Sequence, residues 1–213
     1  MKKFIAEILG TFSLLFFGCS AIIFMGEQIG FVGISFAFGF ALLGVIYGLG
    51  PISGAHLNPA VSLAAYMNGR MGGGEMVQYW IAQVIGAILA SVLLIAMSGD
   101  VNKAVTIVGS FGVLPAFMFE IVGTFFLVTV VLGVTQDEKS SAFAGIVIGS
   151  VLVMIHLAGI SLSGAAVNPV RAIATNIYDA NLYGGLWVYL AGPMLGGALA
   201  GFIHKIGLTR AGD

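Results

Sequence analysis

Long apolar runs separated by short polar segments make up most of this chain of 213 residues. A helix needs about 20 apolar residues to cross a hydrocarbon core of about 30 Å, and six runs reach that length. They cover residues 4–24, 31–49, 76–97, 113–135, 140–159 and 184–203. Little of the chain lies outside them, so the pattern predicts an all-α membrane protein without a sizeable soluble domain.

Composition supports this interpretation. Hydrophobic residues make up 59% of the chain and charged residues 8%, with a mean hydropathy of +1.08, whereas soluble domains carry about 25% charge. A net charge of −1 without a basic tract argues against nucleic acid as a partner. The single cysteine, Cys19, excludes an internal disulfide and a cysteine-based metal cluster. The first span has only Lys2 and Lys3 before it and no clear cleavage site, which indicates a retained helix.

The placement of lysine and arginine predicts the orientation, because cytoplasmic loops carry an excess of both. With six spans drawn, one side of the membrane receives Lys2, Lys3, Arg70, Lys139, Lys205 and Arg210. The other side receives Lys103 and Arg171. Both termini are therefore expected in the cytoplasm. The short termini and loops favour a multi-pass protein of a microbial plasma or inner membrane.

Two motifs occur twice at almost the same offset. The segment AEILGTF at residues 6–12 returns as FEIVGTF at 119–125, and the pair Asn58-Pro59 returns as Asn168-Pro169. This spacing indicates an internal duplication within one transmembrane domain, 1–213. Repeat one covers about 1–98 and repeat two about 113–213. Each copy holds three spans, so the copies are expected to lie inverted about an axis in the membrane plane.

Each repeat also contains an apolar segment too short to cross the membrane, residues 59–67 and 169–178. Asparagine is a favoured N-cap and proline is favoured at the first helical position, so both segments are expected to begin as helices at their Asn-Pro pair. About ten residues give a helix of about 15 Å, half a bilayer. The sequence therefore predicts two re-entrant half-helices that face a water-filled cavity, where non-helical backbone is tolerated.

Two inverted half-helices would meet at their N-termini near the midplane, each carrying roughly half a positive charge from its dipole. Side-chain amides of Asn58 and Asn168 would donate hydrogen bonds to a water there. Such a water accepts from both asparagines and turns its hydrogens outward. This orientation interrupts proton hopping, while the positive potential repels cations.

The boxes SGAHLNPAVS and SGAAVNPVRA, the two Glu-x-x-Gly-Thr-Phe copies and the inverted six-span layout resemble the aquaporin (major intrinsic protein) family over essentially the whole chain. The resemblance implies a right-handed bundle of six helices plus two half-helices, one pore per subunit and a homotetramer in lipid. It implies a passive water channel without a cofactor. The matching pore motifs are Asn58, Pro59, Ala60, Asn168, Pro169 and Val170.

The family's narrowest ring has four positions, and in this chain they correspond to Phe38, His156, Ala165 and Arg171. Phenylalanine, histidine and arginine together resemble the water-selective type. Arg171 would donate hydrogen bonds and repel cations, since an ionised group at such depth is usually functional. The resemblance also implies that Glu7 and Glu120 each hold a re-entrant loop in place, and that His56 helps to support the first loop. A proton-coupled site at the two glutamates is the competing interpretation.

Some positions depart from the family pattern. Val170 stands where alanine is usual, which is expected to shift the spacing of the half-helices slightly, and the small Ala165 is expected to widen the ring. Ala172 follows Arg171, where the glycerol-conducting branch typically has aspartate. Water is therefore favoured, with glycerol, ammonia or CO₂ as alternative substrates.

A secondary transporter is the alternative from another class, because such proteins also use inverted repeats and broken helices. An enzyme is not expected, since no nucleophile with its base and no metal-binding cluster recurs in the spans.

Overall fold

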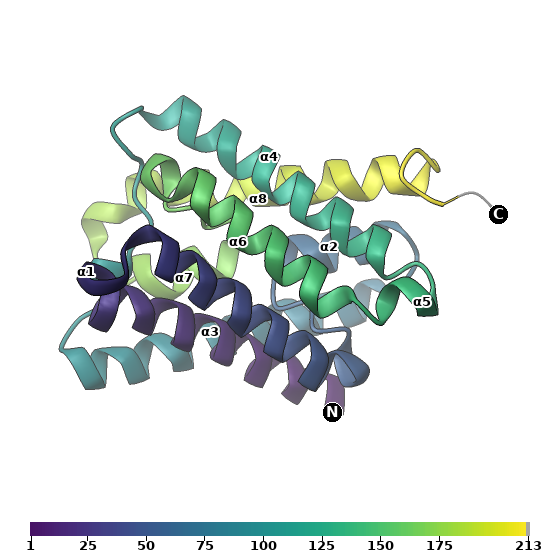
Figure 1. The fold of residues 1–213 in the computed structure, drawn as a ribbon, viewed down its shortest axis with the longest axis horizontal. Coiled ribbons are helices and arrows are strands. Elements are labelled where there is room, and N and C mark those ends of the chain that lie inside the picture. The colour runs from purple at the N-terminus through teal and green to yellow at the C-terminus, as the bar shows by residue number, and fades with distance from the viewer. Residues whose placement is uncertain (212–213) are drawn as a thin grey trace.

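The computed structural model describes residues 1–211, which form helices joined by loops (Figure 1). In chain order the elements are α1 (Lys2–Ser53), α2 (Pro59–Met67), α3 (Gly73–Ser98), the 3₁₀ turn η1 (Asn102–Ala104), α4 (Val113–Val134), α5 (Glu138–Ser141), α6 (Ala144–Ser163), α7 (Pro169–Asn176), the 3₁₀ turn η2 (Ala180–Leu182) and α8 (Tyr183–Lys205). The expected all-α membrane fold is confirmed.

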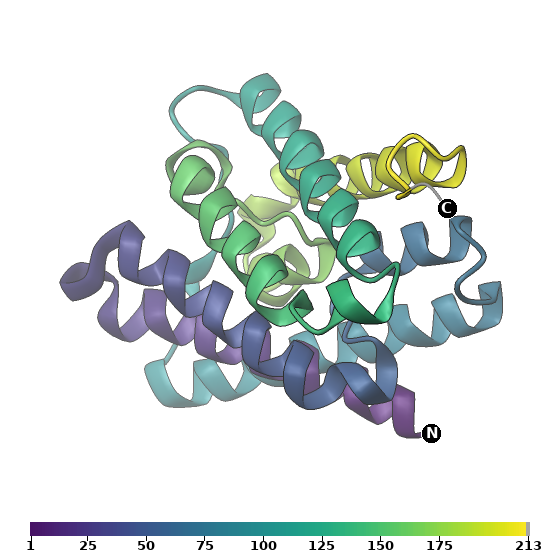
Figure 2. The ribbon, with the colours of Figure 1, turned by 45° about the vertical axis from the view of Figure 1, so that its right-hand side comes forward.

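Helix α1 contains the first two predicted spans. Its helical geometry is interrupted at Gly30, where φ is 58° and ψ is −170°. A residue with a side chain rarely adopts this conformation, so glycine allows the chain to reverse within a single residue. Figure 2 shows the first part of α1 running to the far end of the bundle and the second part returning beside it. The six predicted spans are therefore all present, two of them within α1.

The two half-helices begin where the sequence predicts. Helix α2 covers Pro59–Met67 and α7 covers Pro169–Asn176, two residues shorter than expected at its C-terminus. In each helix the preceding asparagine is the N-cap, with its side chain accepting a hydrogen bond from a backbone amide of the first turn. Nine residues give a length of roughly 14 Å, so neither helix crosses a bilayer.

Close approach of backbones holds the spans together. Gly86 of α3 lies against α1, where an added Cβ would be 3.0 Å from the backbone nitrogen of Phe12. Gly196 of α8 lies against α4 in the same way, with 2.9 Å to the backbone nitrogen of Phe125. These two glycines are 110 positions apart, the offset of the Asn-Pro pairs. Small residues at such contacts are the usual means of tight helix packing in lipid.

The outer surface of the bundle is apolar, as expected for a multi-pass membrane protein. Large hydrophobic side chains such as Phe17, Phe40 and Val122 are about 60% exposed. Helix α1 begins and α8 ends at the same end of the bundle, close to α5 (right in Figure 1). The reversal at Gly30 and the start of α4 lie at the opposite end.

Candidate functional site

A narrow cavity of about 70 Å³ runs through the bundle past both half-helix starts. At 10–15 Å³ of accessible volume per molecule, it has room for about five to seven waters. Apolar side chains of α1, α4 and α6 form most of its wall, including Leu14, Leu42, Leu127 and Leu152. Polar side chains reach it at a few points only: Thr135, His56, Asn58, Asn168, His156 and Arg171.

The asparagines Asn58 and Asn168 tie the two half-helices to each other. The Asn58 Nδ2 donates to the carbonyl of Val167 at 2.8 Å, and the Asn168 Nδ2 donates to the carbonyl of Leu57 at 2.9 Å. Each side-chain oxygen accepts from the backbone amide two residues later, at 2.9 and 3.2 Å. An amide nitrogen carries two hydrogens, so each asparagine keeps one donor for the cavity that it lines.

Val170 lies in the first turn of α7, directly after Pro169. Its side chain is fully buried in the main core together with Ala87 and Ala90 of α3. The reciprocal bonds of the two asparagines, at 2.8 and 2.9 Å, join the two loops with valine at this position.

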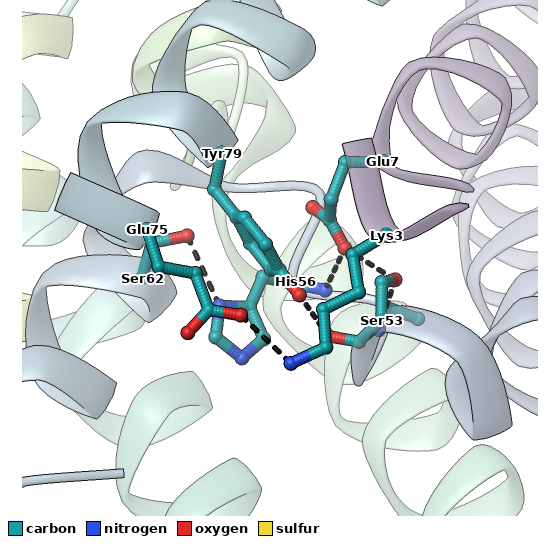
Figure 3. A network of polar contacts seen from close by, with 8 residues as sticks. Lys3, Glu7, Ser53, His56, Ser62, Glu75 and Tyr79 are labelled. Carbon is teal, nitrogen blue, oxygen red and sulfur yellow. Dashed lines mark hydrogen bonds and ion pairs between the residues drawn. The ribbon is translucent and has the colours of Figure 1, made fainter. Parts of the chain in front are cut away.

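Glu7 lies beneath the loop that precedes α2 (Figure 3). Its Oε1 accepts hydrogen bonds from the Ser53 hydroxyl at 2.7 Å and the His56 amide at 3.0 Å. Its Oε2 accepts from the Leu57 amide at 2.8 Å and from Nε2 of Gln83 at 2.9 Å. Two backbone amides and two side-chain groups therefore donate to one carboxyl group. The backbone amides of the loop gain hydrogen bonds that lipid could not provide.

Glu120 occupies the corresponding position under the second loop. It accepts from the Ser163 hydroxyl at 2.6 Å, the Ala166 amide at 2.9 Å and the Val167 amide at 2.6 Å. Both loops contain residues in the left-handed region, with φ between 41° and 55°, namely Ala55, Leu57, Ala165 and Val167. Such backbone is costly for residues with a side chain, above all for β-branched valine. Hydrogen bonds to the two carboxyl groups offset that cost.

The His56 ring lines the cavity from the first loop. Its Nδ1 lies 3.1 Å from the Ser62 hydroxyl, and the ring meets the Tyr79 ring edge-on at 5.0 Å between centroids. Tyr79 in turn donates to the carbonyl of Ser53 at 2.7 Å. Near this network the exposed ion pair of Lys3 with Glu75 joins the starts of α1 and α3 at 2.8 Å (Figure 3).

Phe38, His156 and Arg171 come together where the narrow cavity opens into a vestibule of about 260 Å³, and these three residues line both spaces. The Phe38 and His156 rings stack at 4.6 Å between centroids, with 20° between their planes. The guanidinium carbon of Arg171 lies 5.8 Å from the centroid of Phe38. His156 Nδ1 is 2.9 Å from the carbonyl of Leu152, which can only accept, so this nitrogen carries a hydrogen.

Arg171 is held by a segment that the sequence did not single out, the linker between α3 and α4. Its Nη1 donates to the carbonyl of Ala104 at 2.6 Å and to the Thr175 hydroxyl at 3.1 Å. The Asn176 side chain fixes the linker: its oxygen accepts from the amide and hydroxyl of Thr106, and its nitrogen donates to the Thr106 carbonyl at 2.7 Å. Asn176 lies on α7 with Arg171, so one short helix positions both the charge and the loop above it.

Ala165, the fourth expected ring position, is fully buried and does not line either cavity. Its neighbours do: Gly164 lines the vestibule and Ala166 lines the narrow cavity. Within residues 1–211, no group of three His, Cys, Asp or Glu side chains lies close enough together to hold a metal ion.

Comparison with known proteins agrees with this geometry. The family model described as major intrinsic protein matches residues 1–204. The chain belongs to the major intrinsic protein family. Membership in this family of channels bears out the expectation that the protein is not an enzyme.

Several relatives are named Aquaporin Z. The one from Bradyrhizobium diazoefficiens is 39% identical, covering 96% of this chain and 92% of the relative. The one from Photorhabdus laumondii is 37% identical, covering 97% of each. The X-ray structure of the aquaglyceroporin from Plasmodium falciparum superposes with a TM-score of 0.85 at 23% identity, covering 97% of this chain and 96% of that one, which confirms the fold.

Proposed function

We propose that this family member is a passive water channel whose selective constriction is formed by Phe38, His156 and Arg171. The observation that carries the proposal is that these three side chains line both the narrow cavity and the vestibule, so every permeating molecule passes them. Two of the relatives named Aquaporin Z, at 37–39% identity over nearly the whole chain, support water as the substrate.

Water would cross in single file because the cavity is narrow, and its mostly apolar wall offers the file few hydrogen-bonding groups. At the midpoint, Asn58 and Asn168 each have one free amide hydrogen, and both would donate to the oxygen of a passing water. That water directs its hydrogens away from the half-helices, toward its neighbours in the file. The chain of hydrogen bonds then runs in opposite directions on the two sides, which prevents proton hopping through the centre.

At the constriction, Arg171 supplies hydrogen-bond donors and a positive charge, while the Phe38 ring supplies an apolar wall. A water molecule that enters the constriction loses hydrogen bonds to other waters and gains hydrogen bonds from the arginine. Cations are repelled by the buried charge, and solutes wider than water meet the stacked rings. The Ala165 side chain lines neither space, so we assign the constriction to the other three residues.

We also infer the inverted arrangement of repeats 1–98 and 113–213 within one domain, from the matching roles of Glu7 with Glu120 and Asn58 with Asn168. The excess of lysine and arginine at the end where α1 begins and α8 ends supports cytoplasmic termini in a plasma or inner membrane. A homotetramer in lipid is expected from the family.

Purified protein in proteoliposomes tests the proposal. Stopped-flow light scattering should show rapid shrinkage under a sorbitol gradient, with a low activation energy, and much slower entry of glycerol. Ammonia entry, followed by an internal pH dye, and CO₂ entry complete the profile. Shrinkage no faster than in protein-free vesicles would refute a water channel, and glycerol entry as fast as water would assign the chain to the glycerol-conducting type.

A further inference from the structure

Phe38 reaches the constriction from the second part of α1, and its ring has a neighbour on each side. On the lumen side it stacks on His156 at 4.6 Å between centroids. On the other side it lies against Gly18, in the first part of α1 across the reversal at Gly30. Phe38 is 2% exposed, so its ring is enclosed by neighbours and cannot move without displacing one of them.

Gly18 is not required by the conformation of its own helix. Its φ does not lie in the left-handed region, so an alanine would fit the helix backbone there. The requirement for glycine comes from the neighbour: a Cβ on residue 18 would lie 2.5 Å from Cδ1 and 2.6 Å from Cζ of Phe38, and closer still to Cε1. All three nearest atoms belong to this one ring.

We propose that Gly18 sets the width of the constriction by allowing the Phe38 ring to lie back against the α1 backbone, away from the lumen. This inference rests on the proposed function, since it assigns a positioning residue to the constriction of Phe38, His156 and Arg171. Carbon atoms in contact are separated by about 3.5–4 Å. A methyl group at residue 18 therefore moves the ring by roughly 1 Å, toward His156 and the lumen.

The experiment is a double-mutant cycle of Gly18→Ala and Phe38→Ala in proteoliposomes, with water and glycerol permeability as readouts. Gly18→Ala should lower water permeability roughly fivefold or more, because overpacking displaces the ring into the path. In the Phe38→Ala background, where there is no ring to displace, the same substitution should change neither permeability. Gly26→Ala is the matched control: it lies on the same part of α1, and an added Cβ there meets only ordinary contacts of 3.8 and 3.9 Å.

Each result decides the inference. Wild-type vesicles that shrink no faster than protein-free ones refute the proposed function and this role with it. A fast wild type with Gly18→Ala equal to Gly26→Ala refutes the role of Gly18 alone. So does an equal loss in both backgrounds, because it points to a general distortion of α1. If Gly18→Ala alone fails to fold, recovery of folded protein in the double variant supports the contact, and failure of the double variant overturns it.

Discussion

Replacing Arg171 with valine removes the charged side chain from the constriction while keeping a β-branched apolar residue in the half-helix. The guanidinium carbon lies 5.8 Å from the Phe38 centroid, and we take about 4 Å as the separation of a passing cation from this charge. At an effective dielectric constant of about 20, the repulsion at that distance is about 4 kcal/mol. This corresponds to roughly a thousandfold in rate and sets the upper limit of the expected gain in cation leak.

The assay combines two measurements on the same proteoliposomes. Potassium flux, followed with a potential-sensitive dye, reports the loss of the charge, and stopped-flow glycerol entry reports the loss of the side chain's volume. Both should rise in Arg171→Val. Arg171→Lys is the matched control, because lysine keeps the charge but cannot reproduce the guanidinium's fork of donors. It should therefore let glycerol in faster but still exclude potassium.

The outcomes separate charge from geometry. If Arg171→Val leaves both potassium and glycerol flux at wild-type values, Arg171 does not line the constriction. If Arg171→Lys leaks potassium as much as Arg171→Val, cations are excluded by the fit of the side chain rather than by its charge, and the Coulombic argument is wrong.

Three further predictions concern the supports of the site. Glu120→Gln should lower the free energy of unfolding by about 1–3 kcal/mol for each buried donor that loses its partner. Unfolding in detergent measures this change, and Glu138→Gln on the exposed α5 is the control. Asn176→Ala should raise glycerol permeability although Arg171 is intact. The linker whose carbonyl accepts a hydrogen bond from Arg171 would lose its own hydrogen bonds to Asn176. Unchanged glycerol entry would contradict this prediction. Val170→Ala should cost about 1–3 kcal/mol of stability through a cavity, yet leave the ratio of water to glycerol permeability unchanged.

Local signals in the sequence predicted the elements well. The apolar runs located all six spans, and the Asn-Pro pairs located the starts of both half-helices at Pro59 and Pro169. Helices α1 and α6 each run four residues past the predicted ends, to Ser53 and Ser163. The glycine that follows each serine adopts the left-handed conformation that ends a helix, and the repeated Ser-Gly pair was the signal for this boundary.

Contacts between segments that are distant in the sequence could not be predicted from local patterns. The linker of residues 98–112 is rich in glycine and polar residues, which is typical of a simple connection. Nothing in its own sequence indicates that Ala104 and Thr106 are buried against α7. Asn176 has no special local context either, and its role depends on a segment 70 residues away. Likewise the relation of Gly18 to Phe38 requires the reversal at Gly30, which brings two parts of one helical run side by side.

The inferred duplication would account for the chemistry at the centre of the cavity but not for that of the proposed constriction. Both loops repeat the same parts, namely a glutamate, a serine, a capping asparagine and two residues with positive φ, so the midpoint is nearly symmetric in its chemistry. At the offset of 110, however, Arg171 corresponds to Val61, which lines the cavity as an apolar residue. Only the second half carries the charge. It is held by Thr175 of its own half-helix and by the carbonyl of Ala104 in the linker between the halves, a segment that has no counterpart in the repeat. An arginine on each side of the asparagines would oblige water to lose its hydration at two rings, whereas in the proposed channel a single ring would select and the rest of the cavity would conduct.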